Sequence, residues 1–249
     1  MGLYESCHGG CCRSFAVPVT GADIIHIERK LGLSFWNFVC LWADHKGDIA
    51  RNYAPYFFFK DELETPFVIC LMHEESHFLP GSTKCRFLVE CPADEHYPLG
   101  LARCGIYHER PSAYRTFPTK LNDTGELVVI HDVPERGRSR NNPAYELCPR
   151  QWDPEDVDPI GSLQDLVAAK HEMAFFQNLS NLWNRNPQLW NVFSDFLHLV
   201  YSSRVLCESD DYGAEIEPAT IRIPQTSDDD LWKRPEDRGV GSFLRGAVA

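Results

Sequence analysis

The chain has 249 residues and a formal net charge of -12, and 43% of its residues are hydrophobic. A hydrophobic share of this size supports a folded core and excludes disorder along the whole chain. The negative charge argues against a nucleic-acid partner, because domains that hold phosphates are usually basic.

The ten cysteines raise the question of compartment. Residues 1–7 show neither the basic nor the apolar segment of a secretory signal. No apolar run approaches the ~18 residues that a membrane helix needs. We therefore expect a cytoplasmic protein with no membrane partner, in which cysteines bind metal or perform thiol chemistry rather than form disulfides. A protein partner is left open.

In chain order, the first half predicts one helix followed by strands. Residues 20–45 indicate a helix that Thr20 caps, with Asp23 as the third residue after the cap, and Gly32 could break this helix into two pieces. Residues 55–72 are rich in Phe, Tyr, Val and Ile, which is typical of strand, and 84–90 indicate a second strand.

The second half predicts helices and a polar tail. Residues 161–206 have a helical period, with Ser162 as the cap and Pro187 at the start of a second helix. The apolar stripe of the first helix includes Leu163, Val167, Phe176 and Trp183. The domains are then predicted as a cysteine-rich domain over 1–150, a helical extension over 160–206, and an acidic, flexible tail over 207–249.

Three cysteines lie close together near the start of the chain. Cys7, Cys11 and Cys12 are separated by glycines that let the backbone turn and the sulfurs approach one another. Zinc and iron–sulfur clusters take four thiolate or imidazole ligands in a roughly tetrahedral set. The adjacent pair Cys11 and Cys12 is expected to point in different directions. Further candidate ligands follow downstream at Cys85, Cys104 and Cys148.

Several motifs around these cysteines match one known pattern. They are Cys11-Cys12-Arg13, Cys85-Arg86-Phe87-Leu88, the segment from Cys104 to Pro118, and Cys148-Pro149. On these residues the chain resembles the YkgJ-type cysteine-cluster family, a zinc- or iron-chelating domain with a CxxCxxCC signature. The resemblance covers about residues 4–150.

The chain departs from the family pattern at two positions. Tyr4 and Tyr114 stand where the family has cysteine. The six matching cysteines, which the resemblance implies as metal ligands, still suffice for one four-ligand site: Cys7, Cys11, Cys12, Cys85, Cys104 and Cys148. Tyrosine ligation of ferric iron, a ligand role for His8 and a wholly metal-free member stay open as alternatives.

The resemblance implies a metal-binding protein of unknown cellular role, with zinc or an iron–sulfur cluster as cofactor. The expected fold is α+β, with a small metal-stabilised cysteine-rich domain of short strands and loops and a helical C-terminal segment. The family also includes flagellin lysine N-methylases, so an iron–sulfur-dependent protein lysine methyltransferase is an alternative. The arginines Arg110 and Arg115 either neutralise thiolate charge or make ordinary surface bonds.

A second motif offers a different chemistry. Residues 73–77, His-Glu-Glu-Ser-His, fit the HExxH pattern of zinc hydrolases, in which two histidines one helical turn apart bind the metal. The residues before it indicate strand, and Pro80-Gly81 stops any helix within a turn. A metallohydrolase is therefore a minor alternative.

Overall fold

The computed structural model of this protein describes Cys7 and residues 9–51, 53–78, 81–96, 100–122, 124–129 and 154–209. The chain divides into two compact units, residues 1–202 and 203–249. The second unit is described only at residues 203–209, which end a helix. The described residues do not include Tyr4, His8, Cys148 or the part of the predicted acidic tail beyond residue 209. The predicted domain boundary near residue 150 therefore stays a prediction.

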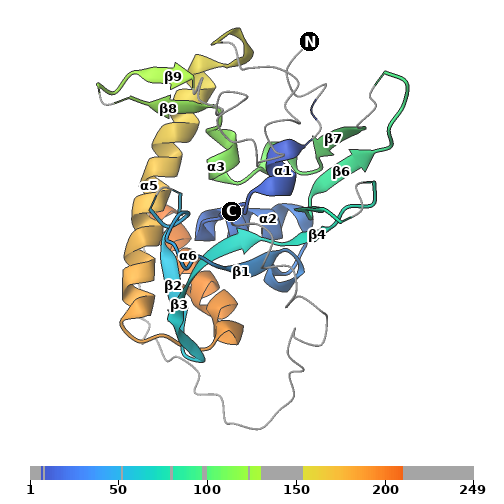
Figure 1. The fold of residues 1–249 in the computed structure, drawn as a ribbon. Coiled ribbons are helices and arrows are strands. Elements are labelled where there is room, and N and C mark those ends of the chain that lie inside the picture. The colour runs from blue at the N-terminus through green and yellow to red at the C-terminus, as the bar shows by residue number, and fades with distance from the viewer. Residues whose placement is uncertain are drawn as a thin grey trace. The chain divides into compact units, whose positions relative to one another are not determined.

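Helices and small antiparallel sheets together give an α+β fold, as predicted (Figure 1). The α-helices are α1 (Gly10–Ser14), α2 (Gly21–Leu31), α3 (Ser112–Arg115), α5 (Pro159–Asn184) and α6 (Phe193–Ser209). The strands are β1 (Val39–Ala43), β2 (Tyr56–Phe59), β3 (Glu62–Leu71), β4 (His73–Glu75), β5 (Thr83–Cys85), β6 (Leu88–Cys91), β7 (Leu101–Cys104), β8 (Thr119–Leu121) and β9 (Leu127–Val129). Short 3-10 helices are η2 (Phe35–Asn37), η3 (Tyr107–Glu109), η4 (Pro154–Asp156) and η5 (Trp190–Val192).

The helix predicted over 20–45 is correct only at its beginning. Thr20 caps α2 as predicted, because its side chain accepts a bond from the Asp23 amide and the Asp23 carboxylate accepts one from the Thr20 amide. Gly32 ends the helix with a left-handed φ of 64°. Beyond it, residues 39–43 form strand β1, because they pair with β3 from Val39↔Leu71 to Ala43↔Phe67.

The largest sheet is three-stranded in the order β1-β3-β2, and the predicted strand over 55–72 is a hairpin of β2 and β3. Side chains of β3 alternate between two apolar clusters. Phe67, Ile69 and Leu71 belong to the main core. Val68 and Cys70 belong to a smaller second cluster.

The predicted starts of both long helices are wrong. Asp158, not Ser162, caps α5, and Pro159 occupies its first turn. The chain after Pro187 is held extended toward the sheet, because the Lys60 amide donates a bond to the Gln188 carbonyl at 3.1 Å. Helix α6 begins only at Phe193, after η5.

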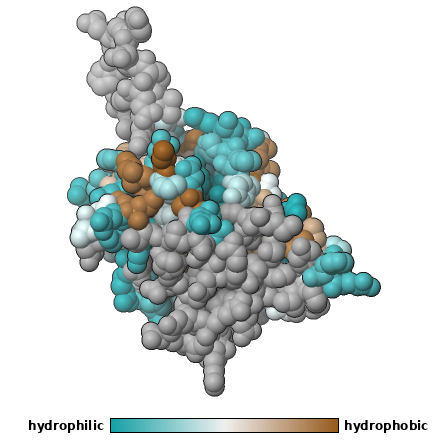
Figure 2. All heavy atoms as spheres, turned by 90° about the horizontal axis from the view of Figure 1, so that it is seen from above, coloured by the Kyte–Doolittle hydropathy of each residue, from teal (hydrophilic) through white to brown (hydrophobic). Residues whose placement is uncertain are grey.

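The predicted apolar stripe of α5 is buried only in its second half. Phe176 and Trp183 lie in the main core, whereas Leu163 and Val167 are 44% and 47% exposed. Ile160 is also exposed. Apolar side chains gather on part of the face that Figure 2 shows. Among the described residues, no helix is long and apolar enough to cross a membrane.

Aromatic rings dominate the core between the three-stranded sheet and helices α5 and α6. The Phe193 ring lies 5.0 Å from Phe57, 4.9 Å from Trp183 and 5.4 Å from Trp190, measured between ring centroids. Helix α5 also bonds to the outer edge of β2. Trp183 donates to the Phe58 carbonyl at 2.8 Å, and the Phe58 amide donates to Asn184 at the same distance.

The remaining strands form three two-stranded hairpins, β4–β5, β6–β7 and β8–β9. The strand predicted over 84–90 is split between β5 and β6 by a turn at residues 86–87. Residues 92–118, which prolines and glycines interrupt, contain β7, η3 and α3. Two of the candidate metal ligands, Cys85 and Cys104, lie on these short strands.

Candidate metal centre

Five of the six predicted ligands lie on elements that contact one another. Cys7 precedes α1, which carries Cys11 and Cys12, while Cys85 ends β5 and Cys104 ends β7. Helix α1 packs against β5. The register of β6 with β7 sets Leu88 opposite Cys104, and Leu88 follows Cys85 by one short turn. The sixth predicted ligand, Cys148, lies outside the described residues.

The approach of α1 to the β6–β7 hairpin depends on a glycine. Gly9 has a φ of 71°, which favours glycine, and a Cβ built there would lie 2.8 Å from Leu88 and 3.0 Å from Ala102. The Ala102 amide donates a bond to the Cys7 carbonyl at 2.8 Å. The start of the chain is therefore fastened to the strand that leads to Cys104.

The two adjacent cysteines face each other, contrary to the expectation that they point apart. Their Sγ atoms are 3.9 Å apart. Two sulfurs bound tetrahedrally to one zinc ion, each at ~2.3 Å, would be about 3.8 Å apart. The pair is therefore spaced as two ligands of a single metal ion would be. Cys7 is engaged differently, because its sulfur accepts a bond from the Gly9 amide at 3.2 Å.

The thiols of α1, β5 and β7 are close enough to influence one another electrostatically. The hydrogen bond with Cys11, then burial, then repulsion by Cys11, Cys85 and Cys104 raise the pKa of Cys12 well above its usual value. Burial raises the pKa of Cys85 to about 11, and repulsion by Cys104 adds to this increase. These mutual effects show that four thiols from three elements share one neighbourhood.

One of the two arginines considered from the sequence acts on these thiols. The hydrogen bond from Cys12 is the main cause that lowers the pKa of Cys11, and the positive charge of Arg110 lowers it further. Burial raises the pKa of Cys104, and Arg110 opposes this increase. Arg115 instead lies 3.7 Å from a carboxylate oxygen of Asp165.

Tyr114, which replaces a family cysteine, lies beside the same thiols. Burial raises the pKa of its phenol well above the usual value, and repulsion by Cys11, Cys12 and Cys85 raises it further. A phenol in this environment stays protonated near neutral pH.

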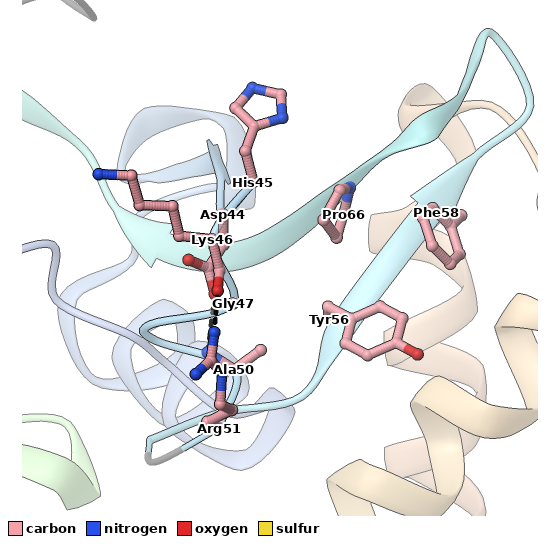
Figure 3. Close-up of a pocket in the computed structure, with 9 residues that line it drawn as sticks. All are labelled: Asp44, His45, Lys46, Gly47, Ala50, Arg51, Tyr56, Phe58 and Pro66. Atoms are coloured by element: carbon pink, nitrogen blue, oxygen red, sulfur yellow. Dashed lines mark hydrogen bonds between the residues drawn. The ribbon is translucent and has the colours of Figure 1, made fainter. Parts of the chain in front are cut away.

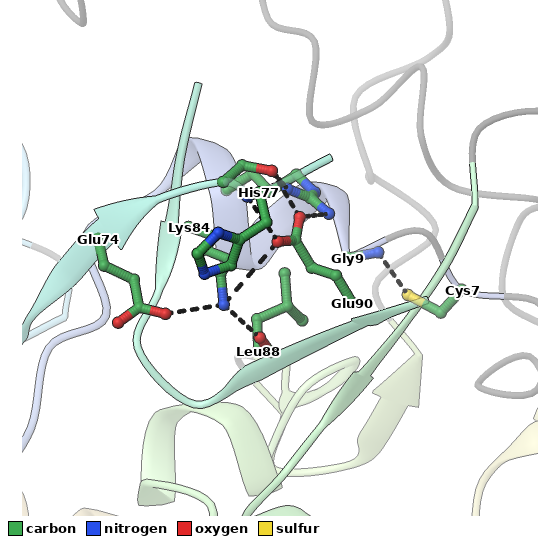
Figure 4. Close-up of polar contacts among 9 residues, drawn as sticks. Cys7, Gly9, Glu74, His77, Lys84, Leu88 and Glu90 are labelled. Atoms are coloured by element: carbon green, nitrogen blue, oxygen red, sulfur yellow. Dashed lines mark hydrogen bonds and ion pairs between the residues drawn. The ribbon is translucent and has the colours of Figure 1, made fainter. Parts of the chain in front are cut away.

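A buried ion pair joins α1 to β6, and Figure 4 shows the polar contacts of Glu90 and Lys84 in this network. Arg13 lies 2.5 Å from a carboxylate oxygen of Glu90, and both side chains are almost fully buried. Ser76 accepts a bond from Arg13 at 3.0 Å and donates one to Glu90 at 2.6 Å. Although burial opposes ionisation, the bonds from Ser76 and Arg13 lower the pKa of Glu90.

A second buried cation extends this network to β5. Lys84 donates a bond to the Leu88 carbonyl at 2.7 Å and lies 2.8 Å from Glu74 and 3.9 Å from Glu90. Lys84 directly precedes Cys85, just as Arg13 directly follows Cys12. The network therefore holds the backbone next to two of the thiols.

The HExxH segment does not have the geometry of a zinc hydrolase. His73 and Glu74 lie on strand β4, which pairs with β5, so the two histidines do not share one face of a helix. His77 is exposed, and Glu74 is paired with Lys84. His73 is half-buried, and burial lowers its pKa. The structure therefore gives no support to the metallohydrolase alternative.

Burial, and to a lesser extent repulsion by Cys85, raises the pKa of Cys40, so Cys40 also lies within electrostatic reach of this group. Cys70 is buried in the second cluster, and Cys40 packs against the same cluster, as expected of core residues. Cys91 is exposed. Within the described ranges, no group of three or more His, Cys, Asp or Glu side chains is close enough together to hold a metal ion. The thiols lie within electrostatic reach of one another, and their sulfur atoms would have to move closer together to bind one metal ion.

A hollow of about 380 Å³ lies elsewhere, beside the turn between β1 and β2 (Figure 3). The Asp44 carboxylate at its edge is used structurally, because it accepts bonds from the amides of Asp48, Ile49 and Ala50. The Lys46 side chain extends away from the rings of Tyr56 and Phe58. The lining side chains do not converge on one point.

Comparison with known proteins yields no relatives. No protein-family model, curated protein or solved structure matches this chain. The YkgJ-type resemblance therefore remains an interpretation of the motif residues, and a function has to be argued from the gathered thiols and their surroundings.

Proposed function

We propose that this chain binds a metal, zinc or an iron–sulfur cluster, through the thiolates of Cys11, Cys12, Cys85 and Cys104. The observation that supports this most directly is that thiols from α1, β5 and β7, far apart in the sequence, share one neighbourhood. A neighbourhood of several buried thiols is unusual for a core, which is normally built from larger apolar side chains. Thiolate sets of this kind are typical of metal sites.

The donor set fits such a metal in its chemistry and in part of its geometry. Four thiolates match a structural zinc site or a cluster site. The 3.9 Å spacing of the Cys11 and Cys12 sulfurs suits two ligands of one ion. Arg110 would offset part of the negative charge of a thiolate-bound ion. When bound, the metal would supply crosslinks between α1 and the hairpins.

We propose a structural role for the metal inside a reducing compartment such as the cytoplasm. The hairpins β4–β5 and β6–β7 have only three or four residues per strand. Isolated two-stranded hairpins of this length are marginally stable in water. A metal that joins three of these elements would add stability that their small apolar contacts do not supply.

Elemental analysis of the full chain, purified without oxygen, tests the proposal. About one zinc per chain without colour would support a structural zinc site. Iron with sulfide and a broad band near ~400 nm would support a cluster and make the methyltransferase alternative worth pursuing. Protein that contains neither metal, and takes up neither after reduction, would refute the proposal.

Matched cysteine variants test the ligand assignment. Cys12→Ser and Cys104→Ser are expected to lose most of the bound metal, because each removes a thiolate ligand. Cys91→Ser is the control, because Cys91 is exposed and belongs to no part of the proposed set. Unchanged metal content in both Cys12→Ser and Cys104→Ser would show that these thiols are not ligands.

A further inference from the structure

We propose that His73 supplies an imidazole ligand to the metal site in place of one of the four proposed thiolates, which makes the site one of three thiolates and one histidine. This inference rests on the proposed function and names a ligand that the cysteine motifs do not contain. It starts from the pairing of β4 with β5, in which His73 lies directly opposite Cys85. Side chains directly opposite in an antiparallel pair project from the same face, with Cβ atoms about 5 Å apart.

The hydrogen bonding of the His73 ring leaves one nitrogen available. The ring bonds to the backbone of Phe15, and Nε2 is buried without a partner among the described residues. We infer that this bond is donated by the N–H of the other ring nitrogen, Nδ1, to the Phe15 carbonyl. This arrangement leaves a lone pair on Nε2, as in metal-bound histidines, which usually donate the other ring N–H to a carbonyl or carboxylate.

The same bond links His73 to the helix that carries two thiols. Phe15 directly follows α1, and its amide donates to the Cys11 carbonyl at 3.1 Å. The imidazole is thus oriented by the end of α1 and lies opposite Cys85. The Trp42 ring, 5.9 Å from the imidazole between centroids, also limits how the ring can turn.

An unpartnered buried nitrogen needs an explanation, because leaving a buried polar group without a hydrogen bond costs about 1–3 kcal/mol. A ligand role supplies one, because a metal ion would occupy the lone pair. Three thiolates and a neutral imidazole on Zn²⁺ give a net charge of -1, compared with -2 for four thiolates.

The test is X-ray absorption at the zinc edge of the full chain, combined with cobalt and zinc titration of the metal-free protein. We expect about three sulfurs at ~2.3 Å and one nitrogen at ~2.0–2.1 Å from zinc. His73→Ala should weaken zinc binding at least about tenfold. It should also shift the visible bands of the Co²⁺-loaded protein. His77→Ala is the matched control, because His77 belongs to the same segment but is exposed.

A second variant covers the case in which His73→Ala fails to fold. His73→Cys should retain zinc and shift the Co²⁺ bands toward those of an all-sulfur site. Zinc bound by sulfur alone in the wild-type protein, or wild-type affinity in His73→Ala, would overturn the assignment of His73 and leave the proposed function intact. Wild-type protein that takes up neither zinc, cobalt nor an iron–sulfur cluster would overturn the proposed function, and this inference with it.

Discussion

The first unit contains two regions that are held together by different means. The aromatic region comprises the sheet β1–β3 with helices α5 and α6, and the cysteine region comprises α1, β4–β7 and α3. The largest fully buried side chains described include Phe35, Phe57, Phe59 and Phe193 of the aromatic region. None of them lies among the described residues between 73 and 118. The cysteine region instead buries thiols, Arg13, Glu90 and Lys84.

The difference indicates which forces each region can rely on. Full burial of an apolar side chain such as Phe contributes roughly 1.5–3 kcal/mol, and the aromatic region has many of them. Buried ion pairs contribute little net stability, because desolvation offsets their attraction. The buried ion pairs of the cysteine region therefore fix its geometry but add little to its stability. A bound metal would contribute most to stability in this region.

The largest effect of a single substitution is expected in the aromatic region. Phe193→Ala should lower the free energy of unfolding by about 4 kcal/mol, because it leaves a cavity among buried rings. Urea unfolding measures the loss. Leu182→Ala on α5 is the control, because Leu182 is 55% exposed and should change stability little. A loss below about 1 kcal/mol for Phe193→Ala would show that this core is not the main source of stability.

The next effect is expected in the cysteine region. Glu90→Gln should destabilise the protein by about 3 kcal/mol, because it leaves Arg13 buried without its carboxylate. Glu75→Gln, at an exposed position of β4, is the control. Equal unfolding midpoints for the two variants would contradict the importance of the ion pair.

The same carboxylate predicts the direction of the pH dependence. The pKa of Glu90 in the folded protein lies below 4.5, its usual value. Its contribution to stability is therefore fully present above about pH 4.5 and is lost as the pH falls through the lower folded-state pKa. The stability difference between wild type and Glu90→Gln should accordingly shrink below pH 4.5, as measured by urea unfolding across the pH range.

A smaller effect is expected where the two regions meet. The buried Asp23 carboxylate accepts bonds from the amide and hydroxyl of Thr20 on one side and of Ser112 on the other. Asp23→Ala should cost about 2 kcal/mol, because it leaves buried donors unpaired. It should also speed hydrogen exchange in α3 more than in β3. Asp23→Asn keeps an acceptor oxygen and should lose less; an equal loss would argue against the hydrogen bonds as the cause.

The smallest effect is expected at the exposed start of α5. Asp158 accepts a bond from the Ile160 amide at 3.1 Å, and Asp158→Ala should cost about 1 kcal/mol as a lost helix cap. Thermal unfolding followed by circular dichroism measures it. Asp158→Ser retains a capping oxygen and should behave like wild type. A larger loss than that of Asp23→Ala would reverse the expected order.

The sequence predicts best those features that depend on neighbouring residues. The Thr20–Asp23 cap follows from a spacing of three residues, and the structure has it. Strand β1 is missed, because its conformation is decided by β3, which is distant in the sequence.

The candidate site shows the same division. The cysteine motifs name the thiols, but the pairing that sets Leu88 opposite Cys104 depends on a hairpin that the sequence does not reveal. His73 could not be singled out from its motif, because its free nitrogen results from a bond between the ring and Phe15, far away in the chain.

The bonding of α5 to β2 has a consequence for how molecules of this protein meet. An edge strand normally offers unpaired amides and carbonyls on which a strand of another chain can add, and this is a common route to aggregation. Here the outward groups of Phe58 are bonded to Trp183 and Asn184, and the Tyr56 carbonyl accepts bonds from Ser180 and Asn184. Side chains of α5 thus occupy the outward backbone groups of β2, so a strand of a neighbouring copy cannot pair with this edge.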